Sequence, residues 1–104
     1  MSDSKIETLR ALVEKNPNNP LGRYGLANEY IKLEMYEEAI NEINAYLKLK
    51  DDEGAVYRIL GEALLKLGRK GEAKEAYRNG IEAAERHGHP GMAAEFEETL
   101  ELID

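Results

Sequence analysis

The strongest constraint on the fold of this chain is a pattern that occurs twice, 34 residues apart. The stretch LANEYIKLEMYEEA, residues 26–39, is followed by LGEALLKLGRKGEA, residues 60–73, with identical residues at five matching places. A period of roughly 20–50 residues is typical of proteins that stack one supersecondary unit, because a single unit cannot bury its apolar face alone. The repetition therefore predicts a stacked-repeat architecture.

Each repeat reads as a pair of helices. Between the turn signals the apolar residues recur at helical spacing, and no segment alternates as a half-buried strand does. The turn signals are NPNNP at 16–20, HGHPG at 87–91, and softer breaks near 34–35, 51–54 and 68–71. They predict about six helices, near residues 5–15, 20–33, 36–50, 54–67, 70–86 and 91–103. Because the links are short, successive helices are expected to pack antiparallel in an all-α fold.

This pattern resembles the tetratricopeptide repeat, whose 34-residue unit reads Trp-x-x-Leu-Gly-x-x-Tyr, then Ala-x-x-x-Phe, then a closing Pro. In the first copy these places hold Arg23, Leu26, Ala27, Tyr30, Ala39, Ile43 and Asp51. In the second copy they hold Tyr57, Leu60, Gly61, Leu64, Ala73, Tyr77 and Glu85. Since Arg23 stands where the family has a bulky aromatic residue, we expect the first helix pair to be less well filled than the second.

The resemblance implies one domain over residues 1–104, folded as an α–α superhelix. We expect a half repeat at 5–19, repeats at 20–53 and 54–87, and a capping helix at 88–104. Small residues stand where two helices must approach closely, at Ala27, Ala39, Gly61 and Ala73. Gly80 lies inside a predicted helix, where it either lets the last helix come close or reflects sequence drift.

Composition excludes several classes of function. The net charge is -7, and residues 87–104 carry -5 of it without a Lys or Arg. An acidic chain without clustered Lys and Arg residues is a poor candidate for binding nucleic acid, because the phosphates require such clusters. No apolar run is long enough to span a membrane, and the chain has no cysteine. We therefore expect a cytoplasmic protein without nucleic-acid or membrane partners.

The resemblance also implies a non-enzymatic adaptor that holds a peptide or helix of another protein in a concave groove lined by the first helix of each pair. The resemblance implies that the partner-binding residues in this groove are Tyr24, Asn28, Lys32, Arg58, Glu62 and Lys66. An aromatic ring beside an amide suits a peptide backbone, and an arginine suits a carboxylate. However, the second three are spaced i, i+4, i+8, and an ordinary salt-bridge ladder is the favoured interpretation of them.

The sequence gives weaker support to two rival functions. His87 and His89 form a His-x-His pair, but they stand in a Gly/Pro turn without a third fixed ligand, so we expect no metal site. No nucleophile has a base beside it, so we expect no catalytic residues, no enzyme activity and no cofactor. The remaining alternative is self-assembly, as a weak homodimer formed through the groove or the acidic C-terminal helix. The acidic face is more simply interpreted as a solvated cap.

Overall fold

The computed structural model describes residues 2–103, with the side chains of residues 5–103, and every regular element in that range is a helix. The six helices are α1 (Ser2–Lys15), α2 (Pro20–Lys32), α3 (Tyr36–Leu49), α4 (Ala55–Lys66), α5 (Lys70–Arg86) and α6 (Pro90–Leu102). The all-α prediction is confirmed. Five helices agree with the predicted bounds to within one residue, and α1 begins three residues earlier than predicted.

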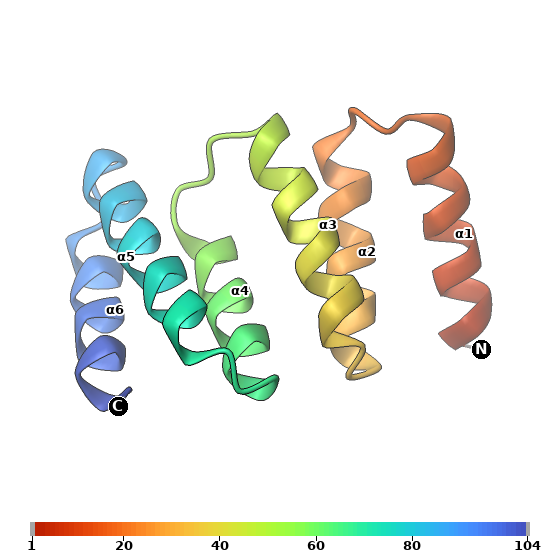
Figure 1. The fold of residues 1–104 in the computed structure, drawn as a ribbon. Coiled ribbons are helices and arrows are strands. Elements are labelled where there is room, and N and C mark those ends of the chain that lie inside the picture. The colour runs from red at the N-terminus through yellow and green to blue at the C-terminus, as the bar shows by residue number, and fades with distance from the viewer. Residues whose placement is uncertain (1, 104) are drawn as a thin grey trace. The chain divides into compact units, whose positions relative to one another are not determined.

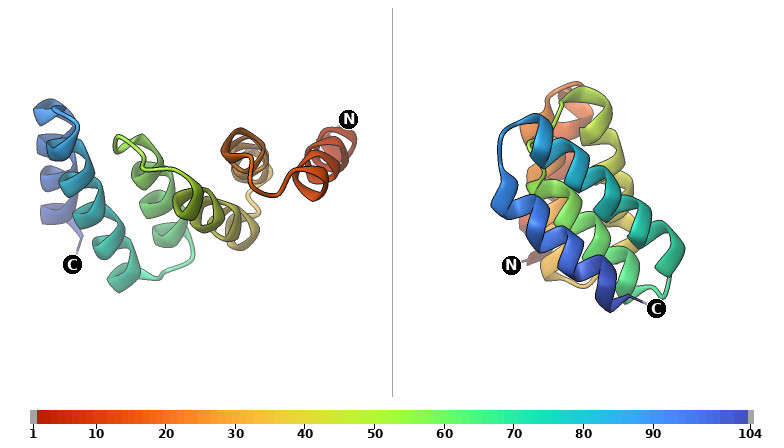
Figure 2. Two further views of the ribbon diagram at one scale, coloured as in Figure 1. Left: turned by 90° about the horizontal axis from the view of Figure 1, so that it is seen from above. Right: turned by 90° about the vertical axis from the view of Figure 1, so that its left-hand side faces the viewer.

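The helices form two compact units, one with α1–α3 and the other with α4–α6. In the first unit α2 packs against both α1 and α3. In the second unit α5 packs against both α4 and α6. Within each unit successive helices run antiparallel (Figure 1), and α6 runs back along α5 (Figure 2).

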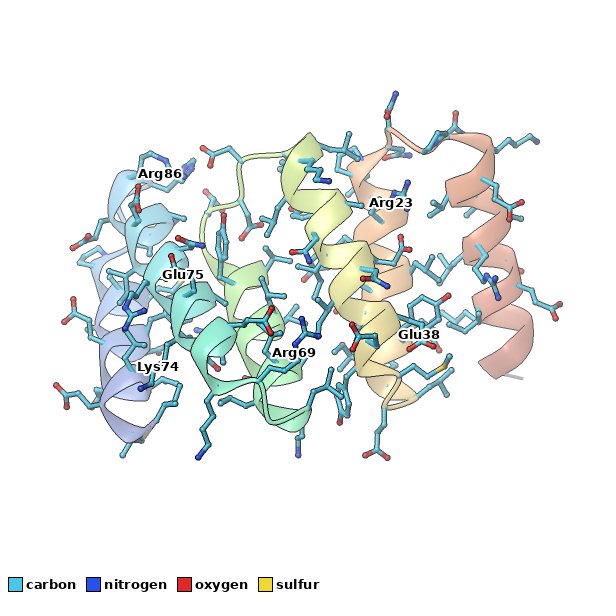
Figure 3. The ribbon with its side chains drawn as sticks, in the orientation of Figure 1. Arg23, Glu38, Arg69, Lys74, Glu75 and Arg86 are labelled. Atoms are coloured by element: carbon cyan, nitrogen blue, oxygen red, sulfur yellow. The ribbon has the colours of Figure 1, made fainter. Side chains whose placement is uncertain are left out.

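The core of the first unit forms where α2 meets its two neighbours. Leu26 and Tyr30 of α2 are buried together with Ile6 and Val13 of α1. The place of the family's aromatic residue is taken by Arg23, which projects from α2 (Figure 3). Its Nη1 lies 2.9 Å from Glu42 Oε1 of α3, and both side chains are largely buried. An ion pair therefore links the two helices where the repeat pattern would place a ring.

The second unit depends on close helix contacts at two glycines. A Cβ built on Gly61 of α4 would lie 2.5 Å from the ring of Tyr77 on α5. A Cβ on Gly80 of α5 would lie 2.8 Å from the ring of Phe96 on α6. Separations this short require displacement of a ring that is itself buried. Gly80 thus lets the last helix come close, which decides between the two interpretations of this residue.

The turn that joins α2 to α3 and the turn that joins α4 to α5 have the same backbone geometry, but a different residue occupies the left-handed position in each. Glu34 lies between α2 and α3 with φ of 57°, and Gly68 lies between α4 and α5 with φ of 74°. After each of them, a backbone N–H donates to a carbonyl in the last turn of the preceding helix: Met35 to Tyr30 at 2.8 Å and Arg69 to Leu64 at 2.9 Å. This is the Schellman arrangement, which favours glycine at the left-handed position.

Side chains also fix where two of the helices begin. Asn19 Oδ1 accepts a hydrogen bond from the Leu21 N–H at 3.0 Å and caps α2, with Pro20 as its first residue. Before α4, Asp52 Oδ2 accepts from the N–H groups of Gly54 at 2.9 Å and Val56 at 3.0 Å. These contacts satisfy backbone donors that have no partner inside the helix.

Candidate functional site

The predicted residues of the first repeat lie along one face of α2. Tyr24, Asn28 and Lys32 follow at intervals of four residues, so they share a face of the helix. Tyr24 and Asn28 are half-buried, whereas Lys32 is exposed. The Tyr24 ring is held against Tyr46 of α3, with ring centroids 5.6 Å apart and planes tilted by 51°. This contact orients an aromatic side chain that still reaches solvent beside an amide able to donate and to accept.

A buried carboxylate that the sequence analysis did not identify lies next to this face. Glu29 of α2 is 6% exposed, and no other charged residue is buried among those the structure describes. Its Oε2 lies 3.3 Å from Lys5 Nζ of α1 and 3.8 Å from Lys32 Nζ. Lys32 is therefore already paired within the chain. The two ammonium groups compensate for removing the carboxylate from water.

The predicted residues of the second repeat lie along one face of α4 in the same way. Arg58 is half-buried, and Glu62 and Lys66 are exposed. The favoured salt-bridge ladder is wrong, because Arg58 pairs with Glu95 of α6, and no ion pair between described residues joins Glu62 to either cation. Arg58 does not pair with Glu62 because packing of α6 places the Glu95 carboxylate beside it.

Arg58 is held by two groups on α6. Its Nη2 donates to Glu95 Oε2 at 2.7 Å, and its Cζ lies 5.3 Å from the centroid of the Phe96 ring. Phe96 is 1% exposed and also contacts Tyr77, with ring centroids 5.7 Å apart. The Arg58 and Glu95 side chains are 41% and 64% exposed. The guanidinium carbon thus lies over a buried ring in a cation–π contact, while the ion pair with Glu95 is exposed to solvent.

A second ionic cluster lies in the second unit, between the segment that precedes α4 and the end of α5. Asp51 Oδ1 lies 2.6 Å from Nη2 of Arg86, which is labelled in Figure 3, and Asp51 Oδ2 lies 2.9 Å from His87 Nε2. The Arg86 guanidinium, followed by His87, holds the pKa of Asp51 below its usual value. His89 Nε2 lies 3.5 Å from Glu53 Oε1. Both histidines therefore contact a carboxylate.

Two features that would indicate other kinds of function are absent from residues 2–103. Among the residues whose side chains the structure describes, no group of three or more His, Cys, Asp or Glu is placed to hold a metal ion. No helix in this range is long and apolar enough to cross a membrane.

A pocket of about 500 Å³ lies in the first unit, away from the six predicted residues. Its lining is rich in amides and cations: Pro17, Asn18, Arg23, Asn41, Asn44, Ala45, Lys48 and Leu49. None of these residues was predicted as a site from the sequence. The spacing of Asn41, Asn44 and Lys48 at i, i+3 and i+7 was the available signal, since it places polar side chains on one face of α3.

The family model that matches the chain is described as the tetratricopeptide repeat. It matches twice, over residues 22–53 and 54–87, which together make up more than half of the chain. Among curated proteins, the small glutamine-rich tetratricopeptide repeat-containing protein 2 of Mycosarcoma maydis is 34% identical over 77 residues. That alignment covers 74% of this chain but 22% of the relative, so the matched part spans about a fifth of the relative's length.

Three solved structures have a similar fold. PcrH, crystallised in complex with the chaperone binding region of PopD, has a TM-score of 0.85 at 20% identity, covering 97% of this chain and 77% of PcrH. Protein BPP2914 from Bordetella parapertussis, solved in solution, has a TM-score of 0.76 at 25% identity, covering 92% and 84%. MamA has a TM-score of 0.75 at 20% identity, covering 95% and 66%.

Proposed function

The chain belongs to the tetratricopeptide repeat family, and we propose that it is a non-enzymatic adaptor that binds a peptide or helix of a partner protein. The observation that carries the proposal is the pair of family repeats at 22–53 and 54–87. Arrays of this kind present the first helix of each pair to their ligands. We assign that role to the face of α2 with Tyr24, Asn28 and Lys32, and to the face of α4 with Arg58, Glu62 and Lys66.

The geometry of each face supports this assignment. Tyr24 is preoriented by Tyr46, so little conformational freedom is lost when a ligand covers its ring. Asn28 and Lys66 make no hydrogen bond or ion pair with the residues that the structure describes, so both are available to a ligand. PcrH has the same fold and was crystallised with a region of PopD, a precedent for protein ligands on this fold.

The test is a binding experiment with matched variants. Peptides are selected from a displayed random library and then titrated against the wild-type protein. We expect the double substitution Asn28→Ala and Lys66→Ala to weaken binding several-fold. The control, Asn44→Ala with Lys48→Ala, removes the same side chains from α3 and should bind as the wild type does. Equal loss in both variants, or loss in the control alone, contradicts the proposal.

Self-assembly remains the second candidate because one apolar side chain on α6 has no role in the fold. Leu102 is 84% exposed and stands next to Glu101 on the acidic helix. Light scattering over a concentration series tests this candidate. A dimer of the wild type that Leu102→Gln abolishes supports self-assembly, whereas a monomer at every concentration removes it. The cytoplasmic location expected from the sequence stays a prediction.

A further inference from the structure

The contact between Arg58 and α6 contains both a site for a carboxylate and an internal occupant of that site. We propose that Arg58 and Phe96 form a subsite for a glutamate side chain of the partner, and that Glu95 is a built-in competitor for it. This inference rests on the proposed function and adds the chemistry of the ligand and a means of regulation.

The guanidinium of Arg58 is preorganised. Its Cζ lies over the Phe96 ring, 5.3 Å from the centroid, and the ring is fixed by burial and by Tyr77. An arginine held in this way loses little side-chain entropy when it binds a further ligand. Among the described residues Glu95 alone accepts a hydrogen bond from Arg58, so the remaining N–H donors stay available to other acceptors.

The internal ligand uses only part of this capacity. Among the described residues Arg58 donates one hydrogen bond, from Nη2 to Glu95 Oε2 at 2.7 Å. A guanidinium has five N–H donors and binds carboxylates best through two parallel hydrogen bonds. Glu95 therefore leaves an interaction that a second carboxylate can improve on, either by replacing Glu95 or by using the other donors.

The ion pair is also weak enough to be displaced. Arg58 and Glu95 are 41% and 64% exposed, so solvent screens their attraction. Phe96 keeps the guanidinium in place when Glu95 leaves, because the ring belongs to the core and not to the ion pair. Exchange of one carboxylate for another therefore requires no change in the packing of α6 on α5.

The internal occupant indicates which kind of carboxylate the subsite accepts. Glu95 is a glutamate side chain presented from a helix, with a long, flexible approach to the cation. A glutamate on a partner peptide reproduces that chemistry. Glu62, one turn beyond Arg58 on α4, is exposed and is not paired with Arg58. It repels a second acidic residue placed one turn further along, which favours one glutamate at a time.

The experiment compares two variants with the same net charge. Glu95→Gln removes the competitor. Glu97→Gln removes a charge from the opposite side of α6, where Glu97 lines a hollow with Glu85 and Pro90. Each protein is titrated with a blocked five-residue alanine peptide that carries one central glutamate, and with its glutamine counterpart. The readout is the NMR signal of the Arg58 Nε–H group, which reports on this side chain alone.

We expect the glutamate peptide to shift the Arg58 signal in every protein and the glutamine peptide to leave it unchanged. Removing an exposed ion pair of this kind should raise the affinity of Glu95→Gln about 1.5- to 5-fold over that of Glu97→Gln. Equal affinities in the two variants overturn the role of Glu95. An unshifted Arg58 signal, or equal shifts with both peptides, overturns the subsite. If library peptides bind through Asn28 and Lys66 without moving the Arg58 signal, the proposed function stands and this inference fails.

Discussion

The turn between α2 and α3 offers a substitution that should stabilise the protein. Glu34 has φ of 57°, whereas Gly68, which occupies the equivalent place 34 residues later, has φ of 74° and no side chain to strain. The left-handed conformation brings the Cβ of a residue too close to the following carbonyl oxygen, at a cost of about 1–2 kcal/mol. The second repeat avoids this strain, and the first does not.

The expected gain for Glu34→Gly follows from two opposing effects. Glycine relieves the strain of about 1–2 kcal/mol, but it also gives the unfolded chain more freedom, which costs roughly 0.5–1 kcal/mol. The net increase in the free energy of unfolding is therefore about 0–1.5 kcal/mol, with a central value of about 0.75 kcal/mol. The hydrogen bond from Met35 N–H to Tyr30 O involves only backbone atoms and should persist.

Urea unfolding followed by circular dichroism measures this change through the shift in midpoint at constant slope. Two control variants separate the cause. Glu34→Gln removes the charge but keeps the Cβ, so its stability should match that of the wild type. Gly68→Glu introduces the same strain in the second repeat and should lower stability by about as much as Glu34→Gly raises it. A gain in Glu34→Gln equal to that of Glu34→Gly refutes the reasoning, as does the absence of a gain in the latter.

Three further predictions concern the second unit. Gly80→Ala places a methyl group against Phe96 and should lower the free energy of unfolding by about 1–3 kcal/mol, measured by urea unfolding. Asp52→Ala removes the carboxylate that accepts from the Gly54 and Val56 N–H groups at the start of α4, and it should lower the free energy of unfolding by about 0.5–2 kcal/mol in the same assay. The pKa of Asp51 in the folded protein is lowered, chiefly by Arg86. Its ion pairs therefore stabilise the folded state above the pKa of 3.8 in the unfolded chain, and this stabilisation is lost as the pH falls through the lower pKa of the folded state. Asp51→Asn should therefore be less stable than the wild type at pH 7, by a margin that narrows as the pH falls below 3.8, and a difference that stays constant from pH 7 to pH 2 contradicts this assignment.

The sequence was most informative about the helices and their pairing. Proline and glycine mark the ends of most helices, and an apolar period of 3.6 residues leaves no alternative to a helix between them. The short links then required antiparallel pairs. The turn at Glu34 was expected only as a break, because glutamate rarely adopts a positive φ and carries no signal for it.

The candidate site was harder to predict because its interactions join residues far apart in the sequence. Arg58 and Glu95 are 37 positions apart, whereas the spacing rules for charged pairs extend only to i+4 on one helix. Glu29 had a usable signal. It follows Gly22 and Leu26 at intervals of seven and three residues, and both of these face α1, so the helical period alone places the carboxylate on a buried face.

The central claim is that α2 and α4 present the surfaces to which a partner binds. The most direct test follows the backbone amide signals of the isotope-labelled protein by NMR while a selected peptide is added. We predict that the largest shifts fall on α2 around Tyr24 and Asn28 and on α4 around Arg58 and Lys66. Shifts concentrated instead on α3 around Asn41 and Lys48, next to the pocket of the first unit, would contradict the claim and move the binding surface to the second helix of the pair.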